Sequence, residues 1–403
     1  MDGALGSDGP GPRGPMRRRA AALVDHPVVR AVLFERLLLS ASAGLAILAL
    51  ATGRVRLPEI PDLLDWRLLA LFFVLTVAVA LGKDSGLFDR LVASAVHGAR
   101  NARTLTLALV GVTAVLAALL TNDVALMLAV PFTMLLRRAA DLDPAPIVVL
   151  EIASANVLGA LTPVGNPQNL FLFTRGGFKP GSFFAAQLPF VAGAAVLLAA
   201  AVPAIVPKRA FPPPTPSPSG VDARLAVAFA VLLGAEIAAL VGAIPWPVPL
   251  VLSLGGAALL GRRIFEADFS LVFVFAFLFV GVAGLERGRV YRALDPSRLF
   301  GHAPTGIAVS GAVLSQLVSN VPAVLLLAPA VRTAAGFRAL LYGVNAGGCG
   351  TPIASIANLI GWQLYRRESP SAGRFWRLFL PVSFALLAAL LLWSLAILRL
   401  PIG

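Results

Sequence analysis

Two short polar stretches interrupt otherwise apolar sequence, and they share one pattern. TNDVALMLAVP begins at Thr121, and SNVPAVLLLAP begins at Ser319. Each opens with a hydroxyl residue and an asparagine, and a proline stands nine positions after that asparagine. Hydroxyl and amide oxygens are ligands for hard cations, and the same side chains donate hydrogen bonds to anions. Because polar groups are costly in apolar surroundings, their repetition indicates a binding site.

A second pair of polar stretches follows the first pair. NVLGALTPVGNPQN covers 156–169 and NAGGCGTPIASIAN covers 345–358, and the two align without a gap. Their prolines remove helical N–H donors and their glycines allow conformations closed to other residues, so each stretch is expected to break a membrane helix in two. The alignment pairs Asn156 with Asn345, Gly159 with Gly348, Thr162 with Thr351, Pro163 with Pro352, Gly165 with Ala354, Asn166 with Ser355 and Asn169 with Asn358.

Broken helices expose backbone groups that ligands can use. In hydrocarbon these groups must be satisfied, so such breaks persist where they line a protein or water-filled cavity. Freed carbonyls, with Asn, Ser and Thr oxygens, suit sodium, and half-helix N-termini suit an anion. Prolines and glycines can also be simple kinks, and Asn or Thr can join helices without binding a ligand. Four stretches in register favour a site instead: one anion site flanked by two cation sites at mid-membrane.

The composition is that of a membrane protein. Of 403 residues, 58% are hydrophobic and 13% are charged, about half the charged fraction of soluble domains. The net charge of +13 comes from Lys and Arg in short clusters between apolar runs. Such flanks are topology signals, so no nucleic-acid partner is expected. The single cysteine, Cys349, excludes a disulfide framework and cysteine-ligated zinc, and no cofactor is expected beyond a coupling sodium ion or proton.

The apolar segments predict an all-α integral membrane protein with an inverted repeat. Two segments, 104–137 and 304–335, are each interrupted midway, leaving halves of about 16 residues that are too short to cross comfortably; they are expected to form re-entrant helical hairpins. An amphipathic connector is expected at 87–100. Crossing segments are expected at 37–53, 66–82, 147–173, 183–206, 224–243, 247–261, 269–285, 339–364 and 376–398.

A stiff proline-rich stretch, PKRAFPPPTPSPSG, divides the chain into two halves. Most basic residues fall on the cytosolic side when the N-terminus is cytosolic, so we expect a multi-pass protein of the inner or plasma membrane in that orientation. The extra helix after the stretch inverts the second half. The expected divisions are a disordered basic cytosolic tail at 1–36, a first membrane repeat at 37–206, a linker at 207–223, a linker helix at 224–243 and a second repeat at 244–403.

The four polar stretches resemble the motifs of the ion transporter superfamily, which includes divalent-anion:sodium symporters, citrate transporters and the arsenite-permease/NhaD branch. The resemblance covers the chain from about residue 37 to its end. It implies an inverted-repeat fold with scaffold and transport domains, a homodimer in the lipid bilayer and an elevator-type motion. Both tips of the sodium–dicarboxylate pattern end in threonine, whereas Asp123 and Val321 stand there in this chain. The Asn-Asp tip and the Asn-x-Pro tip ending at Pro322 are closer to the arsenite-permease/NhaD branch.

The resemblance assigns the site residue by residue. A small anionic substrate is expected at Thr121, Asn122, Thr162, Pro163, Asn166, Ser319, Asn320, Thr351, Pro352 and Ser355. The coupling ion is expected at Asn122, Asp123, Asn156, Gly165, Asn320, Asn345 and Gly348. If the ion is sodium, the candidate ligand sets are Asn122, Asp123 and Asn156, and, in the other half, Asn320 and Asn345.

Three acidic residues fall within the apolar segments. Asp123 is either a ligand of the coupling ion, a proton carrier, or a cap on the second helix of its hairpin. Glu151 either faces cytosolic water or has a function, and Glu236 is expected to pair with a structural neighbour.

The sequence therefore predicts an ion-coupled secondary active transporter of a small anion or oxyanion, driven by sodium or protons. The alternatives are an arsenite/antimonite efflux permease or a sodium/proton antiporter of the same superfamily, and, outside it, a channel. No enzymatic activity is expected, because paired intramembrane aspartates and the HExxH and GxSxG motifs are missing. A primary pump would need a P-loop, which is missing too.

Overall fold

The computed structural model describes residues 27–140, 142–210, 220–288, 301, 303–369 and 372–400. These residues form helices throughout, with one isolated antiparallel bridge between Asn101 and Ala210. Among them, six helical segments are long and apolar enough to cross a bilayer: Trp66–Asp84, Ala102–Leu119, Pro180–Ile205, Ala223–Leu240, Pro247–Glu266 and Ala372–Ile397.

The first half of the chain ends in a helical pair, a broken helix and one long helix. Its elements are α2 (Pro27–Ala51), η1 (Leu57–Glu59), α3 (Ile60–Leu63), α4 (Trp66–Asp84), α5 (Leu87–Val96), α6 (Ala102–Leu119), α7 (Asn122–Ala140), α8 (Ala145–Val157), η2 (Gly159–Leu161), α9 (Pro167–Arg175) and α10 (Pro180–Ile205).

The second half ends in the same order of elements. Its elements are α11 (Ala223–Leu240), α12 (Pro247–Leu260), η3 (Gly261–Glu266), α13 (Ser270–Glu286), α16 (Pro304–Val318), α17 (Asn320–Leu327), η4 (Ala328–Ala330), α18 (Ala334–Gly347), η5 (Pro352–Ala354), α19 (Ile356–Glu368) and α20 (Ala372–Ile397).

The paired and broken helices lie where the sequence predicts them. The turn between α6 and α7 and the turn between α16 and α17 carry the two Asn motifs, and both predicted breaks interrupt a helix. Helix α17 ends at Leu327 and is followed by the 3-10 turn η4. Pro329 lies in the first turn of η4 and has no N–H group with which to continue the α-helical hydrogen bonds.

Two expectations about helix length are wrong. Helix α2 begins at Pro27 rather than at residue 37, since proline suits the first turn of a helix and the following residues are mostly apolar; the rest of the expected tail lies outside the described residues. Helices α6 and α7 have 18 and 19 residues, so α6 is long enough to cross the membrane alone. An Asn101 capping box with Thr104 fixes the start of α6, and the apolar run of α7 continues past its proline.

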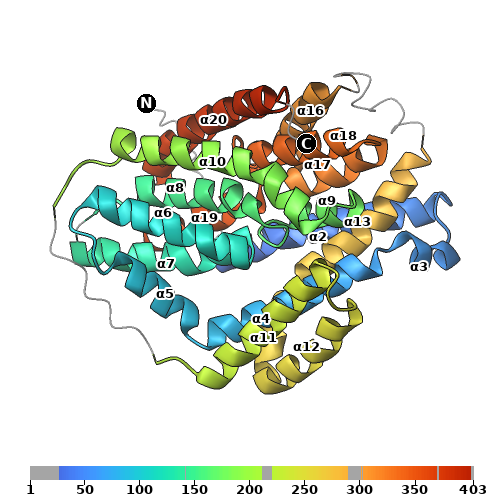
Figure 1. Cartoon of the computed structure of the whole chain (residues 1–403), viewed down its shortest axis with the longest axis horizontal. Coiled ribbons are helices and arrows are strands. Elements are labelled where there is room, and N and C mark those ends of the chain that lie inside the picture. Colours follow the sequence, from blue (N-terminus) through green and yellow to red (C-terminus); the bar gives the residue numbers. More distant parts are fainter. Residues whose placement is uncertain are drawn as a thin grey trace, which may run out of the picture.

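The helices form two groups that meet along the middle of the molecule. Helices α11 and α12 pack on α4, and α13 packs on α2; we call these five helices the scaffold group. The paired and broken helices, α6–α9 and α16–α19, form the hairpin group. Figure 1 shows α4, α11 and α12 along the lower edge, α16, α18 and α20 along the upper edge, and α8, α9 and α19 between them.

The two halves interlock inside the hairpin group. Helix α19, which follows the second break, packs against α7 of the first half, and α9, which follows the first break, packs against α17 of the second half. Within the second half, α16 and α18 approach so closely that a Cβ atom on Gly343 would lie 2.2 Å from the carbonyl oxygen of Ala308. Both breaks are therefore held at the centre of the group by helices of both halves.

Candidate functional site

The first tip is fixed to the first break by backbone and side-chain bonds. The backbone N–H of Asn122 donates to the carbonyl oxygen of Gly165 at 2.9 Å. Its side-chain amide donates to Asn156 Oδ1 at 3.2 Å. Thr121 caps α7, because its hydroxyl accepts from the N–H of Val124 at 3.4 Å. The hydroxyl of Thr121 therefore satisfies one of the free N–H groups at the start of α7.

The two breaks are joined across the halves by buried asparagines. Asn156 Nδ2 donates to Asn358 Oδ1 at 2.8 Å, and Asn345 Nδ2 donates to Asn169 Oδ1 at 2.9 Å. The sequence alignment pairs Asn156 with Asn345 and Asn358 with Asn169. The two bonds are therefore counterparts, each running from the start of one break to the end of the other. We call these four residues the asparagine hub.

Further bonds repeat the same relation between the halves. Ser355 Oγ donates to Asn156 Oδ1 at 2.8 Å, and its aligned residue Asn166 donates to Asn345 Oδ1 at 3.4 Å. Such matched bonds are expected when two repeats are related by an approximate two-fold axis.

The two threonines expected to bind substrate are matched in the same way. The hydroxyl of Thr162 donates to the carbonyl oxygen of Ala118 at 2.5 Å, and that of Thr351 donates to the carbonyl oxygen of Gln316 at 3.1 Å. The adjoining Pro163 is buried and Pro352 is half-buried. These threonine hydroxyls tie each break to the first helix of its own hairpin, so in this structure they hold the framework of the site.

The two glycines expected at the coupling-ion sites differ in how tightly they are packed. A Cβ atom on Gly165 would lie 1.9 Å from the carbonyl oxygen of Gly159, so no larger residue fits there. A Cβ atom on Gly348 would lie 3.4 Å from Asn320 Nδ2 and 3.6 Å from Asn156 Cγ. The structure thus brings the second tip to the second break, beside the asparagine hub.

The second tip is strained where the first is not. Ser319 has φ 73° and ψ 155°, the one positive φ at a non-glycine position among the described residues. Such a conformation costs about 1–3 kcal/mol and is found mainly at functional sites. The Ser319 hydroxyl lies 3.5 Å from Asn320 Oδ1. The two tips share a sequence pattern but differ in backbone conformation.

Two buried oxygens near the hub have no hydrogen-bond partner among the described residues. They are Asn166 Oδ1 and Gln168 Oε1, and both side chains are at most 1% exposed. Gln168 Nε2 donates to Asn345 Oδ1 at 3.2 Å. The sequence analysis did not identify Gln168, because the alignment of the two breaks pairs it with an apolar residue, Ala357. A glutamine at the start of an apolar half-helix was the available signal. These two oxygens suit a cation or a hydrogen-bond donor.

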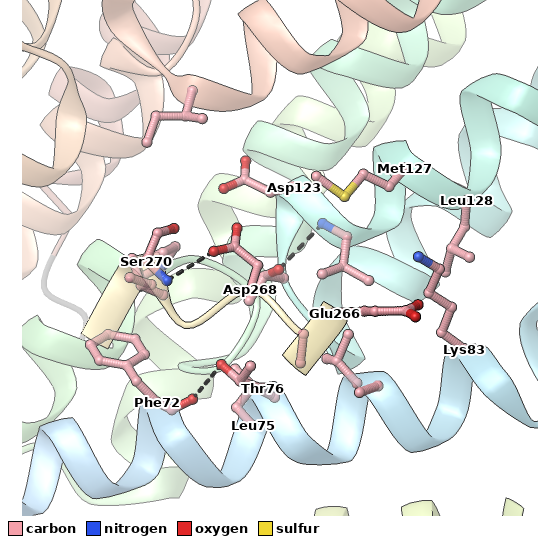
Figure 2. A pocket seen from close by; sticks show the side chains of 18 of the residues that line it. Phe72, Leu75, Thr76, Lys83, Asp123, Met127, Leu128, Glu266, Asp268 and Ser270 are labelled. Atoms are coloured by element: carbon pink, nitrogen blue, oxygen red, sulfur yellow. Dashed lines mark hydrogen bonds between the residues drawn. The ribbon is translucent and has the colours of Figure 1, made fainter. Parts of the chain in front are cut away.

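An open cavity with about 1310 Å³ of empty space, including its mouth, leads to the first tip. It lies between the scaffold group and the hairpin group and is lined by Thr121, Asp123 and Pro167 on the hairpin side. Figure 2 shows Asp123 and Asp268 pointing into the same space, with Lys83 and Glu266 side by side further along. Among the predicted site residues, Asp123 is therefore the one whose charged side chain lines the open cavity.

Acidic groups outnumber basic groups in this cavity. Its carboxylates are Asp84, Asp123, Glu266 and Asp268, and its basic groups are Lys83 and Arg263. Arg263 Nη1 lies 3.3 Å from Asp84 Oδ2. The sequence analysis did not identify Glu266 and Asp268 as residues of the site. Charged residues clustered between two apolar segments were the signal for them.

The second tip faces different surroundings. A second cavity is lined by Ser319 and Pro322 together with apolar residues of α2 and α13, and Leu38 and Ile356 line both cavities. The two tips thus lie beside neighbouring cavities of unlike character, one acidic and one apolar.

The two other acidic residues are fully buried. The hydroxyl of Thr133 donates to Glu151 Oε1 at 2.8 Å, so the expectation that Glu151 faces water is wrong. Neither carboxyl oxygen of Glu236 has a hydrogen-bond partner among the described residues, so its expected structural pairing is wrong too. The physical reason is packing: α8 lies inside the hairpin group, and α11 is covered by α4 and α12.

The apolar helices and the comparisons with known proteins identify a multi-pass membrane transporter. The fold is similar to that of the YdaH transporter of Alcanivorax borkumensis, described as having an unusual topology, with a TM-score of 0.53, 16% identity and coverage of 94% of this chain and 100% of that one. Residues 30–341 match the model of the citrate transporter family, CitMHS, and the chain belongs to that family. The resemblance to the ion transporter superfamily is thereby confirmed.

Curated relatives are transporters and membrane proteins too. The chain is 29% identical over 341 residues to the uncharacterized transporter MJ0456 of Methanocaldococcus jannaschii, covering 82% of this chain and 90% of that protein. It is 30% identical over 322 residues to the inner membrane protein YbiR of Escherichia coli, covering 75% and 81%. Family and relatives agree with the prediction of a transporter rather than an enzyme.

Proposed function

We propose that the protein is an ion-coupled secondary active transporter of a small anion or oxyanion across the cell membrane, with sodium or protons as the coupling ion. The observation that carries this proposal is the asparagine hub. Buried polar groups from both breaks and from the first tip meet there through matched bonds across the halves. Polar groups placed at such cost inside an apolar helical protein mark the ion and substrate site of inverted-repeat transporters.

The atoms around the hub support a site for a coupling cation and for an anionic substrate. Asn122, Asp123, Asn156 and Asn166 place amide and carboxyl groups at the first tip and break, and Asn166 Oδ1 has no hydrogen-bond partner among the described residues. Such oxygens are suitable sodium ligands. Helices α7, α9, α17 and α19 all begin at the tips and breaks. Their N-termini offer N–H groups and a positive dipole end to an anion.

The arrangement of the two groups supports an elevator-type cycle. The acidic cavity lies between the scaffold and hairpin groups, so movement of the hairpin group would change which side of the membrane the tips face. The proposal includes the inverted orientation of the second half, re-entrant hairpins, a cytosolic N-terminus and a homodimer. The matched bonds across the hub support the relation between the halves.

The acidic lining of the cavity favours a second candidate function. Four carboxylates against two basic groups repel a free dianion and attract a cation. A sodium/proton antiporter, or an efflux permease for arsenite or antimonite, would use such a cavity. Both oxyacids are neutral near pH 7, so the carboxylates would not repel them.

Proteoliposome flux measurements test both functions. Purified protein is given citrate, other carboxylates, sulfate, phosphate or arsenite, and uptake is followed under imposed sodium or proton gradients. Saturable anion uptake coupled to one gradient supports the first function. Sodium/proton exchange without anions, or arsenite transport alone, supports the second. No coupled flux for any probe refutes both, and gradient-independent single-channel currents indicate a channel.

A single substitution separates the two candidates further. Asp268→Asn removes one cavity carboxylate without touching the asparagine hub. If dianions are the substrate, their apparent affinity should rise by about threefold to tenfold, as expected for weakened repulsion near a protein surface. If a cation is transported, its apparent affinity should fall instead. The matched control is Asp62→Asn, which lies in α3 outside the cavity.

A further inference from the structure

Glu151 is a buried carboxyl group that the proposed substrate site does not use. It lies in the middle of α8 and is 0% exposed. Its Oε1 atom accepts a hydrogen bond from the Thr133 hydroxyl of α7 at 2.8 Å. Its Oε2 atom is buried with no hydrogen-bond partner among the described residues.

Among the side chains that the structure describes, no basic group is bound to this carboxyl. Those on α6, α7 and α20 donate elsewhere: Arg103 to the carbonyl oxygens of Pro203 and Val206, Arg137 to that of Glu368, Arg374 to the carboxylate of Asp143, and Arg377 to the carbonyl oxygen of Gly373. α10 carries no titratable residue. The remaining titratable groups on α18, α19 and the second break are Arg338, Tyr342, Cys349, Tyr365, Arg366, Arg367 and Glu368.

The lack of a basic partner among the described side chains favours the neutral form of Glu151. An ionised carboxylate without a counter-ion is far more costly in an apolar interior than a neutral carboxylic acid. A neutral group keeps the Thr133 bond, because the carbonyl oxygen of the acid still accepts it. The structure therefore fits a protonated Glu151.

Two hydrogen bonds join the helices that carry Glu151 and the site. α7 begins with Asn122 at the first tip, and α8 carries Asn156 of the asparagine hub. The Asn122–Asn156 bond of 3.2 Å and the Thr133–Glu151 bond of 2.8 Å both connect α7 to α8. A charge on Glu151 would require hydration and would loosen the contact between the two helices. Protonation is thereby linked to the geometry of the first tip.

We propose that Glu151 binds and releases a proton during the transport cycle, so that the proton is a coupling ion of this protein. The inference rests on the proposed ion-coupled transport. The carboxylate takes a proton from water on one side of the membrane while the α7–α8 contact is open. Closing that contact buries the neutral acid, and reopening on the other side returns the proton to water. No oxidation or reduction is involved.

Transport measurements with Glu151→Gln test the proposal. Glutamine keeps the shape and the acceptor for Thr133 but cannot release a proton. The matched control is Glu236→Gln, which removes the ionisable group of the fully buried glutamate on α11. In wild-type protein and in the control, proton-driven flux should change by up to about tenfold per pH unit for a one-proton step. In Glu151→Gln the flux should be independent of pH while counterflow exchange persists. A wild-type pH profile in Glu151→Gln overturns the proposal.

A binding measurement separates this proposal from the proposed transport. Sodium chloride, sodium citrate or sodium arsenite is added to purified protein in weakly buffered detergent, and proton release or uptake is followed with a pH dye. Wild type and Glu236→Gln should exchange up to about one proton per chain, and Glu151→Gln none. Equal exchange in Glu151→Gln, or none in the wild type, overturns the proposal. Proton exchange that depends on Glu151 without flux for any probe refutes the transport function alone.

Discussion

Replacing Asn156 by alanine removes three buried hydrogen bonds at once. The Asn156 side chain donates to Asn358 at 2.8 Å and accepts from Asn122 at 3.2 Å and from Ser355 at 2.8 Å. Side-chain hydrogen bonds between membrane helices contribute about 0.6–1 kcal/mol each. Truncation also leaves three buried polar groups without this partner and opens a small cavity. Asn156→Ala should therefore lower the free energy of unfolding by about 2–4 kcal/mol.

The aligned residue provides an internal comparison. Asn345 donates to Asn169 at 2.9 Å and accepts from Asn166 and Gln168 at 3.4 and 3.2 Å. Since those two accepted bonds are longer, Asn345→Ala should destabilise the protein less than Asn156→Ala. Unfolding in mixed micelles with increasing sodium dodecyl sulfate, followed by tryptophan fluorescence, gives both values.

Transport assays of the same variants complete the test. Flux through Asn156→Ala should fall by at least about tenfold, because the first tip loses its side-chain bond to the break. Ser394→Ala is the control, since the Ser394 hydroxyl bonds only within its own helix, to the Leu390 carbonyl. A larger destabilisation by Asn345→Ala than by Asn156→Ala, or wild-type stability and flux in Asn156→Ala, would contradict this role of Asn156.

Three further changes have defined outcomes. Gly165→Ala should lower stability by about 1–3 kcal/mol and abolish flux, because its Cβ would overlap a carbonyl oxygen. Gly111→Ala, with nothing within 4 Å, should be neutral or stabilising when unfolding in dodecyl sulfate micelles is measured for both variants. Ser319→Gly should raise the unfolding free energy by about 1 kcal/mol by relieving its positive φ, and a decrease would contradict this. The hydrogen bond from Arg287 lowers the pKa of Glu59 below 4.5. The ion pair therefore stabilises the fold fully above pH 4.5, and this stabilisation is lost as the pH falls through the lowered pKa. Arg287→Ala should remove this part of the acid sensitivity of thermal unfolding.

The fold was largely predictable because its strongest signals are local. Long apolar runs give the helices, and proline with glycine gives the breaks. Helix ends were predictable only within several residues, since they depend on caps such as the Asn101–Thr104 box. The length of α6 is one example: the polar tip alone indicated two short halves, while the capping box adds residues at the other end.

The site was predictable in its repeated part and not in its asymmetric part. The alignment identified the four asparagines of the hub, because each residue has a counterpart at the same spacing. Gln168 and Asp268 have no such counterpart, and only packing shows that one lies beside the hub and the other lines the cavity. The same applies to Glu151, because its burial depends on helices from both halves.

The exchange of hydrogen bonds between the two breaks has a consequence for the order of assembly. Asn156 and Asn169 of the first half find these partners only in residues 202 and 176 positions later. Until the second half is synthesised, both side-chain amides lack these hydrogen-bond partners and are surrounded by lipid, water or the translocation machinery. The asparagine hub is therefore expected to be among the last parts of the fold to form. Two halves separated within the 207–223 linker should recover flux when co-expressed, and neither half should form the site alone.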